Sequence, residues 1–291
     1  MSWKNTKLWG RIIKKAKYNL TPILKWVGGK RQLLNEIISL IPEKINTYVE
    51  PFLGGGAVLF FVQPKKAIVN DLNKELINVY NTIKNNSKEL ISKLRELKSL
   101  NSEKYFYDLR SLDRNNDFHQ LDNVFRAARI IYLNKTCYNG LFRLNKAGQF
   151  NTPYGRYKKP NIFDLNNILE MSRYFNDNNI QIINKSYEEV LKNLKKGDFV
   201  YLDPPYMPLS SSSSFTGYTQ SGFDENQQIK LKQICDALNK KGVKFLLSNS
   251  DHPFIKDLYK NYTITIIKAK RVINSKSDKR GEINEILVRN Y

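Results

Sequence analysis

Short runs of β-branched and aromatic residues recur along this chain, and most of them are followed by a turn or a helical pattern. The runs predict strands at 47–50, 67–70, 181–184, 198–202 and 244–248, and a closing hairpin made by 263–269 and 283–290. Helical patterns at 187–195 and 225–241 separate some of these strands. Strands that alternate with helices favour a mostly parallel sheet with helices on both faces. We therefore expect an α/β fold built on a mostly parallel sheet.

The middle of the chain differs from this pattern because strand signals are absent there. Leu and Ile recur at spacings of three and four residues, which predicts helices at 72–100 and 105–133. The stretch 137–157 is then rich in Asn, Gly, aromatic and basic residues. We interpret 72–160 as a mainly helical insert that ends in a loop or β-hairpin near 137–158. It divides the α/β domain into 1–71 and 161–291.

The charge of the chain is strongly positive. Its 48 Lys and Arg residues against 27 Asp and Glu residues give a formal net charge of +21. A field of this sign attracts polyanions, although solubility and a Lys-rich composition would also account for it. Between residues 121 and 160 there are eight basic residues and one acid, Asp122. A clustered basic block points to nucleic acid more strongly than a diffuse excess does.

Membrane and extracellular classes are disfavoured by the sequence. It has no apolar run of about 18 residues, and its basic segment 1–30 lacks the apolar stretch and cleavage site of a signal peptide. Cys137 and Cys235 lie far apart, which suits neither a disulfide framework nor a metal-ligand motif. We expect a cytoplasmic protein without a membrane span or a metal site, and a monomer.

A glycine-rich turn follows the first predicted strand, where residues 50–57 read Glu-Pro-Phe-Leu-Gly-Gly-Gly-Ala. Glycines let the backbone approach a ligand closely, and the following helix presents free N–H groups. A dinucleotide fingerprint would require a third spaced glycine where Leu59 stands, so a nicotinamide cofactor is disfavoured. A tight turn without a ligand is the simpler alternative.

Two further segments could complete a ligand site. Asp71 ends the next predicted strand, where an acid can bind a ribose hydroxyl or serve as the N-cap of the following helix. Residues 25–30 read Lys-Trp-Val-Gly-Gly-Lys, which is not a phosphate-binding P-loop because Leu24 and Arg31 break the required spacing. The glycine pair could still cradle an anion or a carboxylate.

The sharpest motif is Asp203-Pro204-Pro205-Tyr206, which follows an apolar strand. The two prolines stiffen the turn and remove two N–H donors, so its carbonyls are free to accept hydrogen bonds. The carboxylate and the Pro204 carbonyl can together accept both protons of a flat exocyclic amine. The ring of Tyr206 offers a face for a base.

These motifs, in this order, resemble the Dam-family DNA adenine methyltransferases, the alpha group of amino-methyltransferases. The resemblance covers about 24–291, and within the family it points to the Dam-like modification methylases of Dpn-type restriction–modification systems. It implies a Rossmann-like methyltransferase sheet with an inserted target-recognition domain. It also implies transfer of a methyl group from S-adenosylmethionine to adenine N6 in 5′-GATC-3′ duplex DNA, after base flipping and by direct in-line transfer.

The resemblance assigns roles to matching residues. The catalytic set is Asp203, Pro204, Pro205 and Tyr206. The cofactor set is Trp26, Lys30 near the cofactor carboxylate, Phe52, Gly54, Gly55, Gly56, Asp71 at the ribose, and Asp203. The DNA set is Lys25, Tyr138, Asn139, Leu141, Arg143, Pro153 and Arg156, with Tyr138 inserting into the base stack. Arg156, Lys158 and Lys159 fit phosphate contacts better than base contacts.

Other functions remain open at this stage. The substrate could be cytosine N4 in DNA or adenine in RNA, because both present an exocyclic amine. A non-enzymatic basic DNA-binding protein is a second alternative, and a nicotinamide oxidoreductase a distant third. A cognate restriction endonuclease is a possible partner that requires no physical contact. The blander interpretation of Tyr138 and Phe142 is core packing beneath a loop.

Overall fold

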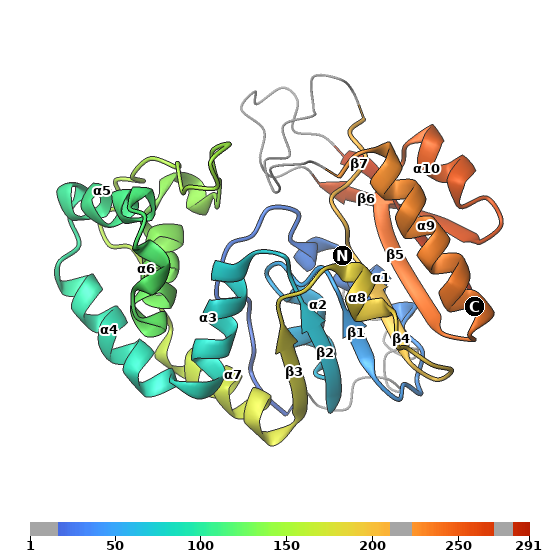
Figure 1. Ribbon diagram of the computed structural model, residues 1–291, viewed down its shortest axis with the longest axis horizontal. Helices are drawn as coiled ribbons and strands as arrows, with labels where there is room; N and C mark the ends of the chain where they lie inside the picture. Colours follow the sequence, from blue (N-terminus) through green and yellow to red (C-terminus); the bar gives the residue numbers. More distant parts are fainter. Residues whose placement is uncertain (1–16, 210–222, 271–281) are drawn as a thin grey trace, which may run out of the picture.

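The computed structural model describes residues 17–209, 223–270 and 282–291. These residues form a seven-stranded sheet with helices around it (Figure 1). The segment 1–16, the serine run at 210–214 and the turn at 271–281 lie outside the described residues. In the described part of the chain, no helix is long and apolar enough to cross a membrane.

All the predicted strands are present, and the observed strand ends differ from the predicted ones by two residues at most. They are β1 (Tyr48–Glu50), β2 (Lys66–Asn70), β3 (Asn179–Ile183), β4 (Phe199–Leu202), β5 (Lys244–Ser250), β6 (Thr263–Lys270) and β7 (Glu282–Arg289). The sheet order is β3-β2-β1-β4-β5-β7-β6, and the first five of these are parallel. Strand β7 runs antiparallel to both β5 and β6, which confirms the closing hairpin.

Helices cover both faces of the sheet because alternate strand residues point to opposite sides. In β4, Phe199 and Tyr201 belong to one buried hydrophobic cluster, while Val200 and Leu202 belong to another. The first cluster is completed by α1 (Leu34–Ser39), α2 (Ala57–Val62), α3 (Lys74–Asn85) and α7 (Leu165–Asp177), and the second by α8 (Tyr187–Leu191), α9 (Glu225–Lys240) and α10 (Pro253–Leu258). The Rossmann-like sheet with helices on both faces is therefore confirmed.

The two long helices expected in the middle are wrong in their extent. The structure has α3, α4 (Ser87–Ser99), α5 (Glu103–Ser111) and α6 (Asn123–Thr136), with short 3-10 turns η3 (Leu112–Arg114) and η4 (Phe118–Gln120). Side chains of Ser102 and Asp122 cap α5 and α6 by accepting backbone N–H bonds. The Asp122 cap restarts the helix within the predicted range 105–133, where apolar periodicity indicates one continuous helix. The break within 72–100 falls at Asn86, which makes no side-chain cap bond. Asn73, not Asp71, is the side-chain cap of α3.

Helix α3 joins the sheet to the helical middle. It packs against β3 and α7 on one side and against α4 and α6 on the other, and one hydrophobic cluster continues through all of them. Figure 1 shows α4, α5 and α6 gathered beyond the β3 edge of the sheet. The division into 1–71 with 161–291 and a separate 72–160 stays a prediction, since the two parts share this core.

We predict that Leu246→Ala lowers the free energy of unfolding by about 2–5 kcal/mol, because it leaves a cavity in a close-packed interior. Leu246 is 0% exposed in β5. Urea unfolding measures the change. The control is Ile266→Ala on edge strand β6, where the side chain is 55% exposed and the expected cost is below about 0.5 kcal/mol. Equal losses in the two variants would contradict the core assignment.

Candidate active site

The predicted motifs meet at the carboxyl ends of the central strands. The strand order reverses between β1 and β4, since β1 is followed by β2 on one side and β4 by β5 on the other, and a crevice opens between them. It holds a pocket of about 950 Å³. The predicted residues that line the pocket are Trp26, Lys30, Phe52, Gly54, Asp71, Asp203, Pro204, Pro205 and Tyr206. Tertiary structure therefore brings together three motifs that are remote in sequence.

The glycine turn is built around Gly54. Its φ is +48°, and a Cβ there would meet Cδ1 of Trp26 at 2.8 Å, so no other residue fits without a shift. Its N–H donates to Oδ2 of Asp71 at 2.9 Å. Gly55 packs against Trp26, and Gly56 takes a left-handed conformation at the start of α2, so neither lines the pocket.

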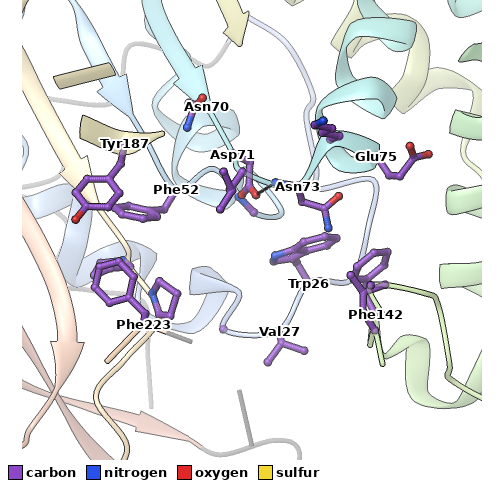
Figure 2. Close-up of a pocket in the computed structure, with 18 of the residues that line it drawn as sticks. Trp26, Val27, Phe52, Asn70, Asp71, Asn73, Glu75, Phe142, Tyr187 and Phe223 are labelled. Carbon is purple, nitrogen blue, oxygen red and sulfur yellow. Dashed lines mark hydrogen bonds between the residues drawn. The ribbon is translucent and has the colours of Figure 1, made fainter. Parts of the chain in front are cut away.

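Asp71 lies directly after β2 and faces the pocket. Its other oxygen, Oδ1, accepts the N–H of Asn73 at 2.9 Å. Burial raises the pKa of Asp71, while the N–H donors of Asn73, Gly54 and Leu72 oppose that rise. Figure 2 shows Asp71 between Phe52 and Asn73 in the middle of the pocket. The carboxylate is thus fixed in place where it can accept from a ligand.

Buried Lys30 and partly buried Asp203 form an ion pair. Nζ of Lys30, in the short turn η2 (Lys30–Gln32), lies 2.8 Å from Oδ1 of Asp203. It also donates to the Gly28 carbonyl at 2.6 Å and sits 4.7 Å from the ring centroid of Tyr206. Burial raises the pKa of Asp203, and the Lys30 ammonium opposes that rise. The sequence predicted Lys30 at the pocket but not its contact with Asp203.

Two aromatic residues that the sequence did not predict, Tyr187 and Phe223, lie beside the predicted Phe52 on the opposite wall of the pocket. The ring centroid of Phe52 lies 5.3 Å from that of Tyr187 and 6.0 Å from that of Phe223. Figure 2 shows the three rings together, away from Trp26. Tyr187 begins α8 soon after β3, so the rule that ligands bind at strand carboxyl ends could have found it. Phe223 follows no motif, and only the folded chain reveals it.

Asn70, which the sequence also did not predict as a site residue, links the segments at the strand ends by hydrogen bonds. Its side-chain amide donates to the carbonyls of Pro51 and Lys185 at 2.9 and 3.0 Å and accepts the Lys185 N–H at 2.8 Å. These bonds link the segments that follow β1, β2 and β3. The floor of the pocket is therefore held by a buried side chain rather than by strand pairing alone.

The predicted DNA residues lie outside the pocket, and all of them except Lys25 are on or next to an irregular hairpin. Antiparallel bridges join Cys137 to Tyr154 and Leu144 to Phe150. Tyr138 is 57% exposed, whereas Phe142 is buried and stacks on Trp26 at 4.5 Å. Core packing is thus the right interpretation for Phe142 but not for Tyr138. Leu141 is partly buried on this hairpin.

The polar members of the predicted DNA set are held by local bonds. Arg143 donates to the side chain and the carbonyl of Asn151 at 2.7 and 3.1 Å. The Pro153 carbonyl accepts the N–H of Tyr138, while Arg156 lies 3.5 Å from Glu103. Asn139 takes a left-handed conformation, with φ at +57°.

Asn134 attaches this hairpin to the Lys-Trp segment. Its buried amide accepts the N–H of Lys25 at 2.8 Å and donates to the carbonyls of Lys25 and Gly140. Lys25 therefore lies beside the Tyr138–Gly140 turn (η5), as the predicted DNA set requires. The same bonds connect the pocket to the hairpin.

Glu50, at the end of β1, is a buried carboxyl beneath the pocket. It accepts from the hydroxyl of Tyr48 at 2.7 Å and is 2% exposed. Burial raises its pKa from 4.5 to about 8, although the Tyr48 bond opposes the shift. Nearby Asp203 and Asp71 raise it further. The group is therefore mostly protonated near neutral pH.

We predict that Glu50→Gln becomes more stable relative to the unaltered protein as pH rises from about 5 to about 8. The folded-state pKa of Glu50 is about 8 and the usual value is 4.5, so the unfolded chain ionises first and stability falls over this window. The amide of the Glu50→Gln variant does not ionise, so its free energy of unfolding does not fall over this window for that reason. Chemical unfolding at several pH values measures it, with exposed Glu43→Gln as the control. A stability difference that does not change with pH would contradict the prediction.

Comparison with known proteins agrees with this geometry. The D12 class N6 adenine-specific DNA methyltransferase family matches residues 26–273. The type II methyltransferase M1.LlaDCHI of Lactococcus lactis subsp. cremoris is 48% identical over 280 residues, which span 96% of this chain and 99% of that protein. The type II methyltransferase M.MjaIII of Methanocaldococcus jannaschii is 43% identical, over 93% of this chain and 99% of that protein.

The DNA adenine methylase of Escherichia coli strain K12 is 34% identical, over 91% of this chain and 93% of that protein. The family match to residues 26–273 spans the segment from Trp26, the glycine turn, the hairpin and the Asp-Pro-Pro-Tyr corner. It confirms the resemblance to Dam-type enzymes and removes the non-enzymatic and oxidoreductase alternatives. The chain belongs to the D12 class of N6 adenine-specific DNA methyltransferases.

Proposed function

We propose that this enzyme methylates adenine N6 within 5′-GATC-3′ duplex DNA, with S-adenosylmethionine as the methyl donor. The observation that carries the proposal is the corner formed by Lys30, Asp203 and Tyr206 at the crevice beside β1. There a partly buried carboxylate and an aromatic ring line the same pocket as Asp71. An adenine held there would have both its amine and its ring recognised.

The residues of the pocket fit S-adenosylmethionine. Phe52, Tyr187 and Phe223 offer apolar faces for an adenine ring, and Asp71 offers a carboxylate for the ribose hydroxyls. Trp26 and Gly54 leave room for the rest of the molecule along the glycine turn. When bound, S-adenosylmethionine supplies a methyl group on a sulfonium, which is already a good leaving group.

The chain's own contribution to the reaction is mainly positioning. Lys30 binds Oδ1 of Asp203, which leaves Oδ2 to accept one N–H of the target amine. The Pro204 carbonyl accepts the other, and the nitrogen lone pair then points along the direction of transfer. Holding the reacting atoms in line accounts for much of the rate in a reaction of this kind. No covalent intermediate on the protein is required.

The hairpin supports a role in reading the duplex. Extruding an adenine costs a few kcal/mol, which stacking on Tyr206 and insertion of exposed Tyr138 can offset. Arg143 can exchange its bonds to Asn151 for a bidentate contact with guanine O6 and N7. We assign the remaining base contacts to Lys25, Asn139, Leu141 and Pro153, and phosphate contacts to Arg156, Lys158 and Lys159.

The proposal also includes the division of the chain into domains and the biological role of the enzyme. We assign target recognition to 72–160 and catalysis to 1–71 with 161–291, and we expect a monomer. The names of two relatives, type II methyltransferases, support a protective role in a restriction–modification system. Such a role requires no contact with the nuclease. Cytosine N4 and RNA adenine are less favoured because the family is adenine-specific and acts on DNA.

We predict that Asp203→Ala lowers the methyl-transfer rate by at least about 100-fold while duplex affinity is retained, because an acceptor at the reacting centre is lost. Transfer of labelled methyl groups to an oligonucleotide and fluorescence anisotropy measure the two properties. The control is Asp257→Ala, whose side chain is 77% exposed. Full turnover by Asp203→Ala would refute the role assigned to this carboxylate.

We predict that plasmid treated with the enzyme resists a methylation-sensitive GATC nuclease. Arg143→Ala should reduce discrimination between GATC and singly substituted sites by about 1–3 kcal/mol, whereas Lys158→Ala should weaken binding to all sites equally. Methylation rates on a panel of oligonucleotides measure both effects. Methyl incorporation with unaltered cutting would contradict the GATC assignment.

A further inference from the structure

The carbonyls of the Asp-Pro-Pro-Tyr corner are not equivalent. The Pro205 carbonyl accepts a hydrogen bond from Nε2 of Gln228 at 3.0 Å, and the Met207 carbonyl accepts one from the hydroxyl of Ser250 at 2.7 Å. Among the described residues, none donates a hydrogen bond to the Pro204 carbonyl, and Pro204 lines the pocket. The fold therefore occupies the carbonyls of Pro205 and Met207, while the Pro204 carbonyl, in a residue that lines the pocket, stays available to a ligand.

The bond to Pro205 ends a chain of two buried amides. Oε1 of Gln228 accepts from Nδ2 of Asn249 at 3.1 Å. Oδ1 of Asn249 in turn accepts the N–H groups of Met207 and Ser250 at 3.2 and 2.9 Å. Both amide side chains are 0% exposed. Helix α9 and the end of β5 thus hold the corner from outside the pocket.

The hydrogen bonds of these two amides can run in only one favourable direction. Each amide uses its oxygen as an acceptor and its nitrogen as a donor, so turning Gln228 over would set its oxygen against the Pro205 carbonyl and its nitrogen against the Asn249 nitrogen. Buried polar groups that lose a partner cost about 1–3 kcal/mol each. The backbone N–H groups of Met207 and Ser250 fix the orientation of the Asn249 amide. Asn249 in turn fixes Gln228 so that its nitrogen donates to the Pro205 carbonyl.

This arrangement restricts the rotations that remain in the corner. The proline rings fix φ at Pro204 and Pro205, so ψ is the main freedom left at each. Gln228 fixes the direction of the Pro205 carbonyl, and Asn249 fixes the N–H of Met207. Little rotation is then left that could turn the Pro204 carbonyl away from the pocket.

We propose that Gln228 and Asn249 are positioning residues that act as a unit to aim the Pro204 carbonyl at the target amine. The inference rests on the proposed function, in which that carbonyl accepts one of the amine protons. Neither side chain touches the substrate, since both bind the corner from its far side. Their contribution should therefore be to the transfer step and not to binding.

The test is the single-turnover rate constant with enzyme in excess over duplex, which does not depend on the fraction of enzyme that is folded. Gln228→Met removes the donor at nearly constant volume, and the rate constant should fall about 10- to 100-fold, as expected for slight misplacement of a reacting group. Affinities for duplex and for S-adenosylmethionine should be unchanged. Gln228→Asn keeps an amide too short to reach Pro205, and it carries the test if Gln228→Met does not fold.

Two comparisons complete the design. Gln233→Met on the exposed face of α9 should leave the rate constant unchanged. Adding Asn249→Leu to Gln228→Met should cost little beyond the larger single loss, because residues that act as a unit are not additive. Unchanged rate constants in both Gln228 variants, losses that multiply in the double variant, or weakened binding as the main effect would overturn the proposal. Absence of transfer by the unaltered enzyme would instead refute the proposed function.

Discussion

The contact between Lys30 and Asp203 organises the site. A carboxylate removed from water is costly unless an opposite charge and hydrogen bonds compensate it, and here the ammonium of Lys30 lies 2.8 Å away. The same ammonium binds the Gly28 carbonyl and faces the ring of Tyr206. One buried cation therefore opposes the rise that burial causes in the pKa of Asp203, binds the glycine pair through the Gly28 carbonyl and lies over the ring of Tyr206.

The second constraint is the attachment of the recognition hairpin to this site. Asn134 binds both Lys25 and Gly140, and Trp26, the next residue after Lys25, stacks on Phe142, two residues after Gly140. A movement of the hairpin is thus transmitted to the segment that carries Lys30. The residues proposed to read DNA and the residues proposed to receive the flipped base are therefore joined by direct contacts between these two segments.

Some sequence predictions were limited by what a linear pattern contains. Apolar periodicity found the helical middle but not the breaks at Asn86 and at 112–122. The second of these ends at a capping bond made by Asp122, which an apolar pattern does not contain. The three glycines form one ligand-binding motif in the sequence, yet only Gly54 lines the pocket. Gly56 instead adopts the left-handed backbone conformation in which the chain enters α2. Phe223 and Asn70 follow no recognisable motif, and their roles arise from neighbours that are distant in the chain.

The sequence by itself determined the strands, the α/β class, the motifs and the family resemblance, because each is encoded by local spacing and local backbone preference. Only the tertiary structure decided which atoms meet. The sheet order places β1 between β2 and β4 and so brings Lys30, Asp71 and Asp203 into one crevice. It likewise places Gln228 and Asn249 behind the corner. Such contacts follow from strand order and from the burial of polar groups that must find partners, and neither is written in any short stretch of sequence.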